Sequence, residues 1–80
     1  MKFEIYHTPG CQKCKLTDRK LKASGLNSAL IPITDELITY MRSKGMTSAP
    51  LVRVTDDDGV LVDEWSDMNV AKIQHYTKEA

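Results

Sequence analysis

One stretch of the sequence determines the fold class of this chain. It is HTPGCQKCK, His7-Thr8-Pro9-Gly10-Cys11-Gln12-Lys13-Cys14-Lys15. It contains both cysteines of the sequence, with only two residues between them. Proline lacks an amide donor and glycine adopts backbone conformations closed to other residues, so the Pro-Gly pair predicts a break in regular structure. The segments on either side of this break decide whether the two thiols lie at a junction of elements.

A strand precedes the break and a helix follows it. Residues 2–7 (KFEIYH) alternate apolar and polar side chains, which is typical of a β-strand. From Cys11 onward the period becomes helical, because Cys14, Thr17 and Leu21 fall on one face. Gly25 is well placed to end this helix. The pattern therefore predicts a strand-to-helix junction with Cys11 at the helix N-terminus.

The remaining sequence predicts five further elements. Residues 28–33 (SALIPI) favour a strand, and Pro32 within it indicates a sheet edge. A helix capped by Thr34 or Asp35 follows and runs to Lys44.

Two β-rich runs, residues 51–55 (LVRVT) and 60–65 (VLVDEW), flank an Asp/Gly turn and predict a hairpin. A last helix is expected from about Asn69. The order βαβ–α–ββ–α predicts an α/β fold with a mixed four-stranded sheet flanked by three helices, in which the first two strands are parallel.

Length and charge narrow the class of protein. Eighty residues fit one domain, residues 1–80, and the eleven basic and eleven acidic side chains cancel. No broad positive field is then available for nucleic acid or an anionic membrane, and no apolar run approaches the ~20 residues of a membrane span. We expect a soluble cytoplasmic monomer. Stable disulfides are rare in that compartment, so a close cysteine pair indicates redox chemistry or metal binding.

The redox interpretation assigns different roles to the two thiols. At a helix N-terminus, free backbone N–H groups and the positive end of the helix dipole stabilise a thiolate at Cys11. Cys14 lies one turn further, more buried but close enough to form a disulfide with Cys11. Cys11 is therefore expected to attack a substrate disulfide, and Cys14 to resolve the mixed disulfide that results.

Two other interpretations of the pair stay open. Cys11 and Cys14 form half of a zinc site if His7 and His75 supply the other two ligands, which makes the chain a small interaction module. Alternatively, the pair consists of two inert thiols, although the exposed helix start argues against this for Cys11.

Three motifs resemble one known family. The stretch YHTPGCQKC after a first strand resembles the cysteine motif of the glutaredoxin family, and Ser48-Ala49-Pro50 before the third strand resembles its cis-proline signature. Trp65-Ser66 after the fourth strand, with Gln12-Lys13 between the cysteines, resembles the NrdH-redoxins most closely. The resemblance covers nearly the whole chain and implies a thioredoxin-like fold of the glutaredoxin type.

The resemblance also implies an activity and a site. NrdH-redoxins are dithiol carriers that are reduced by thioredoxin reductase and donate electrons to ribonucleotide reductase, without a metal or organic cofactor. By resemblance, the Ala49–Pro50 bond is cis and lies against the cysteines, so that the Ala49 backbone pairs with an extended substrate. Trp65 ends a strand and by itself favours a half-buried lid on the sheet, but by resemblance it lies near the cysteines as an exposed indole. The implied substrate-binding residues are Thr8, Gln12, Lys13, Ser48, Ala49, Pro50, Trp65 and Ser66.

Two departures from the family bear on the electron donor. Thr8 stands where a lysine is common, which removes a cation for a glutathione carboxylate. Residues 67–70 (DMNV) replace the usual Gly, Phe, charged residue and Pro after Trp-Ser. Weak use of glutathione is therefore expected, with a glutathione-dependent glutaredoxin as the alternative.

Overall fold

Strand β1 (Lys2–His7) lies inside a four-stranded sheet of order β2-β1-β3-β4 in the computed structural model, which describes residues 1–78. It pairs parallel with β2 (Asn27–Pro32) and antiparallel with β3 (Leu51–Thr55). Strand β4 (Leu61–Ser66) then pairs antiparallel with β3. The predicted mixed sheet and hairpin are confirmed, whereas the last two positions of the predicted domain, 79 and 80, lie outside the described residues.

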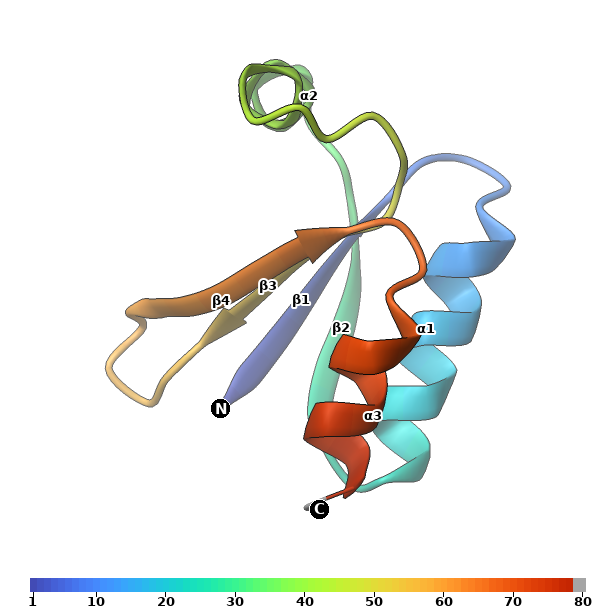
Figure 1. Cartoon of the computed structure of the whole chain (residues 1–80), viewed down its shortest axis with the longest axis vertical. Coiled ribbons are helices and arrows are strands. Elements are labelled where there is room, and N and C mark those ends of the chain that lie inside the picture. The colour runs from blue at the N-terminus through green and yellow to red at the C-terminus, as the bar shows by residue number, and fades with distance from the viewer. Residues whose placement is uncertain (79–80) are drawn as a thin grey trace.

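Three helices complete the element order β1-α1-β2-α2-β3-β4-α3. Helices α1 (Gln12–Ala23) and α3 (Val70–Lys78) lie side by side on one face of the sheet, and α2 (Asp35–Ser43) stands beyond the end at which β1 finishes (Figure 1). Thr34 caps α2, because its hydroxyl oxygen accepts from the Leu37 N–H at 3.2 Å. The predicted helices are confirmed to within one or two residues.

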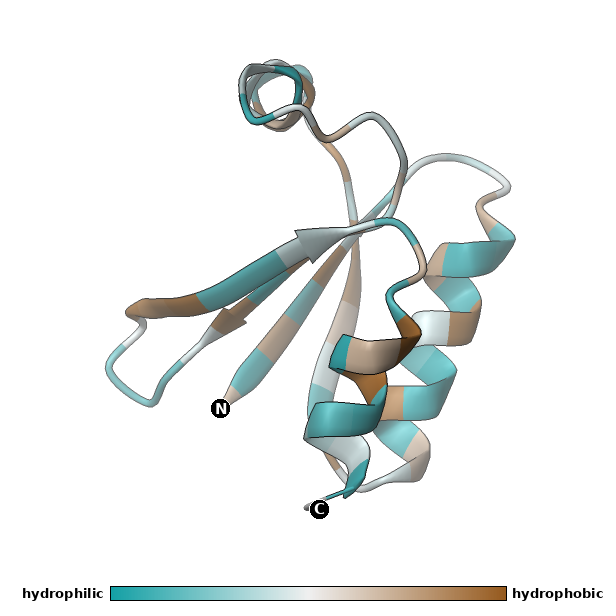
Figure 2. Ribbon diagram, viewed as in Figure 1, coloured by the Kyte–Doolittle hydropathy of each residue, from teal (hydrophilic) through white to brown (hydrophobic). Residues whose placement is uncertain are grey.

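The hydrophobic core lies between the sheet and the α1–α3 layer. Alternation along β1 turns Phe3 and Ile5 toward these helices, and Figure 2 shows the same alternation as brown and teal bands. Cys14, Thr17 and Leu21 of α1 are fully buried, as their helical spacing predicts. The core cluster consists of Phe3, Ile5, Cys14, Leu21, Val52, Val54 and Trp65.

The opposite face of the sheet has charged side chains at its centre and the buried Leu51 near its α2 end. Glu4 pairs with Arg53 across β1 and β3, and Arg53 pairs with Glu64 across β3 and β4. The Tyr40 hydroxyl of α2 donates to Glu64, and the Arg53 guanidinium lies 4.7 Å from the centroid of the Tyr40 ring. Helix α2 is therefore attached through polar contacts together with the buried side chain of Met41.

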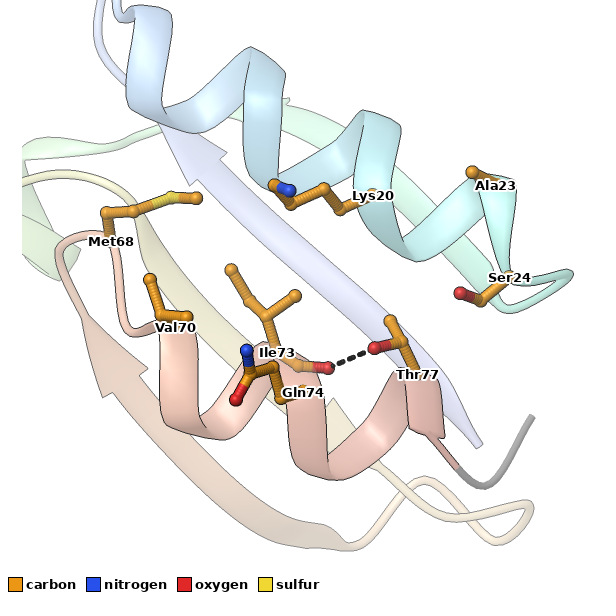
Figure 3. A pocket seen from close by; sticks show the side chains of 8 residues that line it. All are labelled: Lys20, Ala23, Ser24, Met68, Val70, Ile73, Gln74 and Thr77. Carbon is orange, nitrogen blue, oxygen red and sulfur yellow. Dashed lines mark hydrogen bonds between the residues drawn. The ribbon is translucent and has the colours of Figure 1, made fainter.

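Helix α3 docks through Ile73 and Tyr76. Ile73 is buried and points from α3 toward α1 across a hollow of about 300 Å³, which Figure 3 shows with Lys20 on its α1 side. The Tyr76 ring stacks on Trp65 with centroids 5.9 Å apart, and its hydroxyl donates to Asp63 at 2.8 Å. Burial, together with this bond to a carboxylate, raises the pKa of Tyr76 to about 12.

Asp63 joins α3 to the hairpin. Its carboxylate accepts from Tyr76 and also from the Lys72 ammonium at 2.8 Å. Burial by itself would raise the pKa of Asp63, but the hydrogen bonds from Lys72 and Tyr76 outweigh burial and lower it. The ionised carboxylate is therefore favoured by the folded state.

Asp63→Asn should lower the free energy of unfolding by about 1–2 kcal/mol at neutral pH, because two hydrogen bonds to a charged group are weakened. A lowered pKa stabilises the fold above the unfolded-state value of about 3.9, and this contribution is lost as the pH falls through the folded-state pKa. Urea unfolding should therefore show a difference between the two proteins that shrinks in acid. Asp58→Asn, in the exposed hairpin turn, is the matched control and should change little. Equal stability of Asp63→Asn and the unaltered chain at neutral pH would contradict this account.

Candidate functional site

The two cysteines are joined in a disulfide and differ in exposure. Their Cα atoms lie 5.3 Å apart, inside the usual disulfide range of roughly 4.4–6.8 Å. Cys11 is the N-cap of α1 and its Sγ accepts from the Cys14 N–H at 3.1 Å. Cys14 is fully buried in the core cluster, whereas Cys11 is half-buried. The expected difference in burial is present, and only Cys11 is open to a partner molecule.

The first turn of α1 is positively charged. It holds Lys13 and Lys15 and no acidic residue, whereas the first turn of α2 holds Asp35 and Glu36. The positive end of a helix dipole favours acidic residues, as in α2, and disfavours cations. Because Lys15, the dipole and the Cys14 N–H all attract negative charge, this end of α1 favours a thiolate at Cys11.

The loop before β3 lies near Thr8, in the segment that leads to Cys11. The Ala49–Pro50 peptide bond is cis, as the resemblance implies, and Pro50 is fully buried. Ala49 and Cys11 both pack against the core cluster. Within residues 1–78, the backbone N–H and C=O of Ala49 have no hydrogen-bond partner. This backbone is therefore available for pairing with an extended chain.

Asp67 ties the separate parts of the site together. Its N–H donates to the carbonyl oxygens of Ser48 at 3.2 Å and Pro50 at 2.9 Å. Its carboxylate accepts from the Lys13 ammonium at 2.6 Å and from the Met68 N–H at 2.7 Å. The bond from Lys13, and then that from Met68, lowers the pKa of Asp67. The segment between the cysteines is thus linked to the loop before β3.

The sequence analysis missed this role of Asp67. Its backbone φ is +65°, the left-handed region that aspartate and asparagine enter more readily than most residues. An aspartate between the last strand and the last helix was the available signal. The partners it would meet were not visible in the sequence.

A groove beside Thr8, in the loop that leads to Cys11, brings three of the expected substrate-binding residues together. Its volume is about 230 Å³, and Thr8, Ser48 and Ala49 form one side. Apolar side chains of α2 and its flanking loops form most of the remainder, and Arg42 is its one charged lining residue. The complete lining is Thr8, Ile33, Ile38, Met41, Arg42, Met46, Thr47, Ser48 and Ala49.

Arg42 was also missed by the sequence analysis. It follows Ile38 by four residues on α2, so the two side chains lie on one face of the helix. That spacing was the signal, but the position of α2 beside Thr8 was not. The groove therefore has a cation although position 8 is neutral.

The remaining expected contact residues lie elsewhere. Gln12 is exposed at the start of α1, and Ser66 pairs with Leu51 inside the β-ladder. The expectation of an exposed Trp65 indole is wrong, because Trp65 is 4% exposed. Trp65 pairs with Val52 in the ladder, and side chains of directly opposed residues point to the same face. That face is the core, where Tyr76 covers the indole.

The zinc interpretation requires four ligands close together, which residues 1–78 do not assemble. In the described part of the chain, no group of three or more His, Cys, Asp or Glu side chains is placed to hold a metal ion. His7 instead has its Nδ1 3.3 Å from the Thr8 carbonyl oxygen.

Within residues 1–78, no helix is long and apolar enough to cross a membrane.

Comparison with known proteins shows the fold. No protein-family model and no curated protein matches the chain. Among solved structures, the chain is similar to the glutaredoxin-like protein NrdH-redoxin from Escherichia coli, whose structure is reported as the basis for a thioredoxin-like activity profile. The two are 23% identical with a TM-score of 0.72, over 94% of this chain and 93% of that one. The chain therefore has the thioredoxin-like, glutaredoxin-type fold that the resemblance implied.

Variants of Asp67 separate its backbone from its side chain. Asp67→Gly keeps the positive φ without strain and removes both side-chain bonds, whereas Asp67→Ala also places a Cβ in a disfavoured conformation. We expect the melting temperature to fall in the order Asn, Gly, Ala, with Ala about 5 °C below Gly. Asparagine tolerates this φ and still accepts from the Met68 N–H. Equal melting temperatures for Gly and Ala would show that the backbone conformation is unimportant.

Proposed function

We propose that this protein is a thiol–disulfide oxidoreductase, in which the Cys11–Cys14 dithiol carries two electrons to protein disulfides. The observation that supports this proposal is the half-buried Cys11 at the N-terminus of α1, bonded to a Cys14 that is fully buried. One sulfur is thus accessible and favoured as a thiolate, and the other is held within reach but shielded.

The reaction begins from the reduced protein. The Cys11 thiolate attacks one sulfur of the substrate disulfide, which forms a mixed disulfide and releases the first substrate thiolate. The Cys14 thiolate then attacks Cys11 Sγ, which forms the Cys11–Cys14 disulfide and releases the second substrate thiolate. Two electrons pass to the substrate and its thiolates take up two protons. The dithiol supplies both electrons, so the proposal requires no metal or organic cofactor.

Cysteine variants test the two roles. Cys14→Ser should accumulate mixed disulfides with a disulfide substrate such as insulin, because no resolving thiol remains, whereas Cys11→Ser should accumulate none. Both variants should lose at least about 100-fold in turnover, since each removes a participating thiol. Mass spectrometry of the trapped species and the alkylation rate of each cysteine at neutral pH measure this. Faster alkylation of Cys14 than of Cys11 would reverse the assignment.

The proposed donor and client follow from the resemblance and from the neutral centre of the site. We propose reduction by thioredoxin reductase and delivery of electrons to a cytoplasmic protein disulfide such as that of ribonucleotide reductase, with the carrier acting as a monomer. The Ala49 backbone offers pairing to an extended client segment, and the adjacent apolar groove offers space for one of its side chains. Lys13 is neutralised by Asp67, so the contact surface next to Cys11 has little net charge.

Arg42 favours a second candidate, a glutathione-dependent glutaredoxin. It lies in the groove that Thr8 also lines and supplies the cation that position 8 lacks. At the other end of the site, the Asp67 carboxylate already accepts from Lys13 and Met68, which leaves it less available to a glutathione ammonium group. We therefore retain the thioredoxin reductase proposal and use Arg42 to test it.

Paired donor assays distinguish the two candidates. Reduction of the oxidised protein should be efficient with thioredoxin reductase and NADPH, and weak with glutathione and glutathione reductase. Arg42→Gln should leave the first rate nearly unchanged, as should the control Lys44→Gln, an exposed cation outside the groove. Two results together would assign the protein to the glutathione-dependent class. The unaltered chain would be reduced with comparable efficiency by both donors, and the KM for glutathione would rise about 10-fold in Arg42→Gln but not in Lys44→Gln. Stoichiometric zinc in the reduced protein would instead favour the interaction module.

A further inference from the structure

Positive charge is concentrated on α1, although the whole chain is balanced. Helix α1 contains five basic side chains and one acidic one, whereas residues 24–68 contain three basic and eight acidic ones. The helix that begins at the reactive cysteine therefore differs in charge from most of the molecule. Its ribbon is largely hydrophilic along its length in Figure 2.

Three of the five α1 cations have no counter-charge in the protein. Lys13 pairs with Asp67, and Lys22 pairs with Asp18 at 2.9 Å. Lys15, Arg19 and Lys20 are exposed and make no ion pair within residues 1–78. Lys15 lies in the first turn, where a cation is unfavourable to the helix. Neither packing nor helix stability explains its charge.

Two of these cations, Lys15 and Arg19, border a partly apolar surface, whereas Lys20 lines the hollow between α1 and α3. An open hollow between α1 and β2 is lined by Lys15, Asp18, Arg19, Lys22, Ala23 and Leu30. Leu30 on the edge strand is 36% exposed, and Leu16 on α1 is 39% exposed. The surface thus offers contacts for an apolar side chain with positive charges around it, an arrangement typical of a protein docking site.

The hollow and the reactive sulfur of Cys11 are close enough to be covered by a single protein–protein interface. A helix rises about 1.5 Å per residue, so Lys15 and Lys22 lie roughly 6 and 16 Å along the axis from Cys11. A standard interface covers about 800 Å² on each partner, equivalent to a circle of roughly 16 Å radius. A folded protein that reaches Cys11 can therefore contact this surface in the same complex.

We propose that Lys15, Leu16, Arg19, Lys22 and Leu30 form a docking face, the α1 face, for an acidic segment of the protein whose disulfide Cys11 reduces. The inference rests on the proposed function and specifies its substrate class: disulfide proteins with acidic side chains and an apolar residue near the reactive cysteines. The two unpaired cations of this face, Lys15 and Arg19, on a chain with no net charge favour a short acidic segment over a long polyanion, because the acidic remainder of the surface repels a polyanion.

Two synthetic peptides with one intramolecular disulfide and one leucine test the α1 face. They are identical except that four flanking residues are glutamate in one and glutamine in the other. At low salt, the reduced protein should reduce the glutamate peptide about 3- to 10-fold faster, and the ratio should approach one as added salt screens the charges. Lys15→Gln/Arg19→Gln should abolish the preference. The control Lys2→Gln/Lys78→Gln removes equal charge from exposed sites off α1 and should keep it. The ratio of rates cancels any change in Cys11 reactivity.

The outcomes separate this inference from the proposed function. Equal reduction of both peptides would overturn the α1 face and leave the oxidoreductase intact. If neither peptide is reduced, the proposed function fails, and fluorescence anisotropy with serine-substituted peptides still tests the face. Tighter binding of the glutamate peptide, lost in Lys15→Gln/Arg19→Gln, would then support it. The assignment to a protein partner would be overturned if the peptides did not bind and these cations bound only duplex DNA or phosphatidylserine vesicles.

Discussion

Burial of Cys14 in the hydrophobic core constrains everything that the cysteine pair can do. Cys14 shares one face of α1 with Thr17 and Leu21, and all three are fully buried. The helix cannot turn Cys14 outward without exposing Leu21 and opening the core over Phe3 and Ile5. Cys11 is thereby held at the N-cap, half-buried, with the Cys14 N–H directed at its sulfur. Core packing thus distinguishes the accessible sulfur from the shielded one.

The rest of the site is positioned around this pair by backbone contacts. A single N–H, that of Asp67, bonds to two carbonyl oxygens of the loop before β3, and the Asp67 carboxylate bonds to Lys13 between the cysteines. The loop after β4 consequently holds both the cysteine segment and the backbone of Ala49 in place. It also removes net charge from the surface next to Cys11, because Lys13 and Asp67 neutralise each other. A partner approaching Cys11 first meets a largely neutral surface.

Charge instead lies on the two sides of this neutral centre. Arg42 borders the apolar groove on the side of α2, and the cations of α1 border the hollow on the side of β2. The groove has a volume of about 230 Å³ and the hollow one of about 680 Å³, so they suit different ligands. The groove suits a single side chain or a small thiol, whereas the helix face suits a folded partner. In the proposed function, most of the residues that would select a partner are therefore distinct from the two cysteines that exchange the disulfide.

The sequence by itself determined the local part of this protein: the strand that ends before Cys11, the helix that begins there, the burial of Cys14 and the order of the elements. These features depend on residues within about one or two turns of each other, where side-chain periodicity reports directly on burial. The tertiary structure decided what depends on distant residues. Trp65 is buried by its ladder partner Val52 and by the packing of Tyr76. Lys13 bonds to Asp67, which is 54 residues away in the sequence. Arg42 lines the same groove as Thr8. Periodicity within a strand or helix gives its faces but not the neighbour each face meets, because that neighbour is set by sheet register and helix placement.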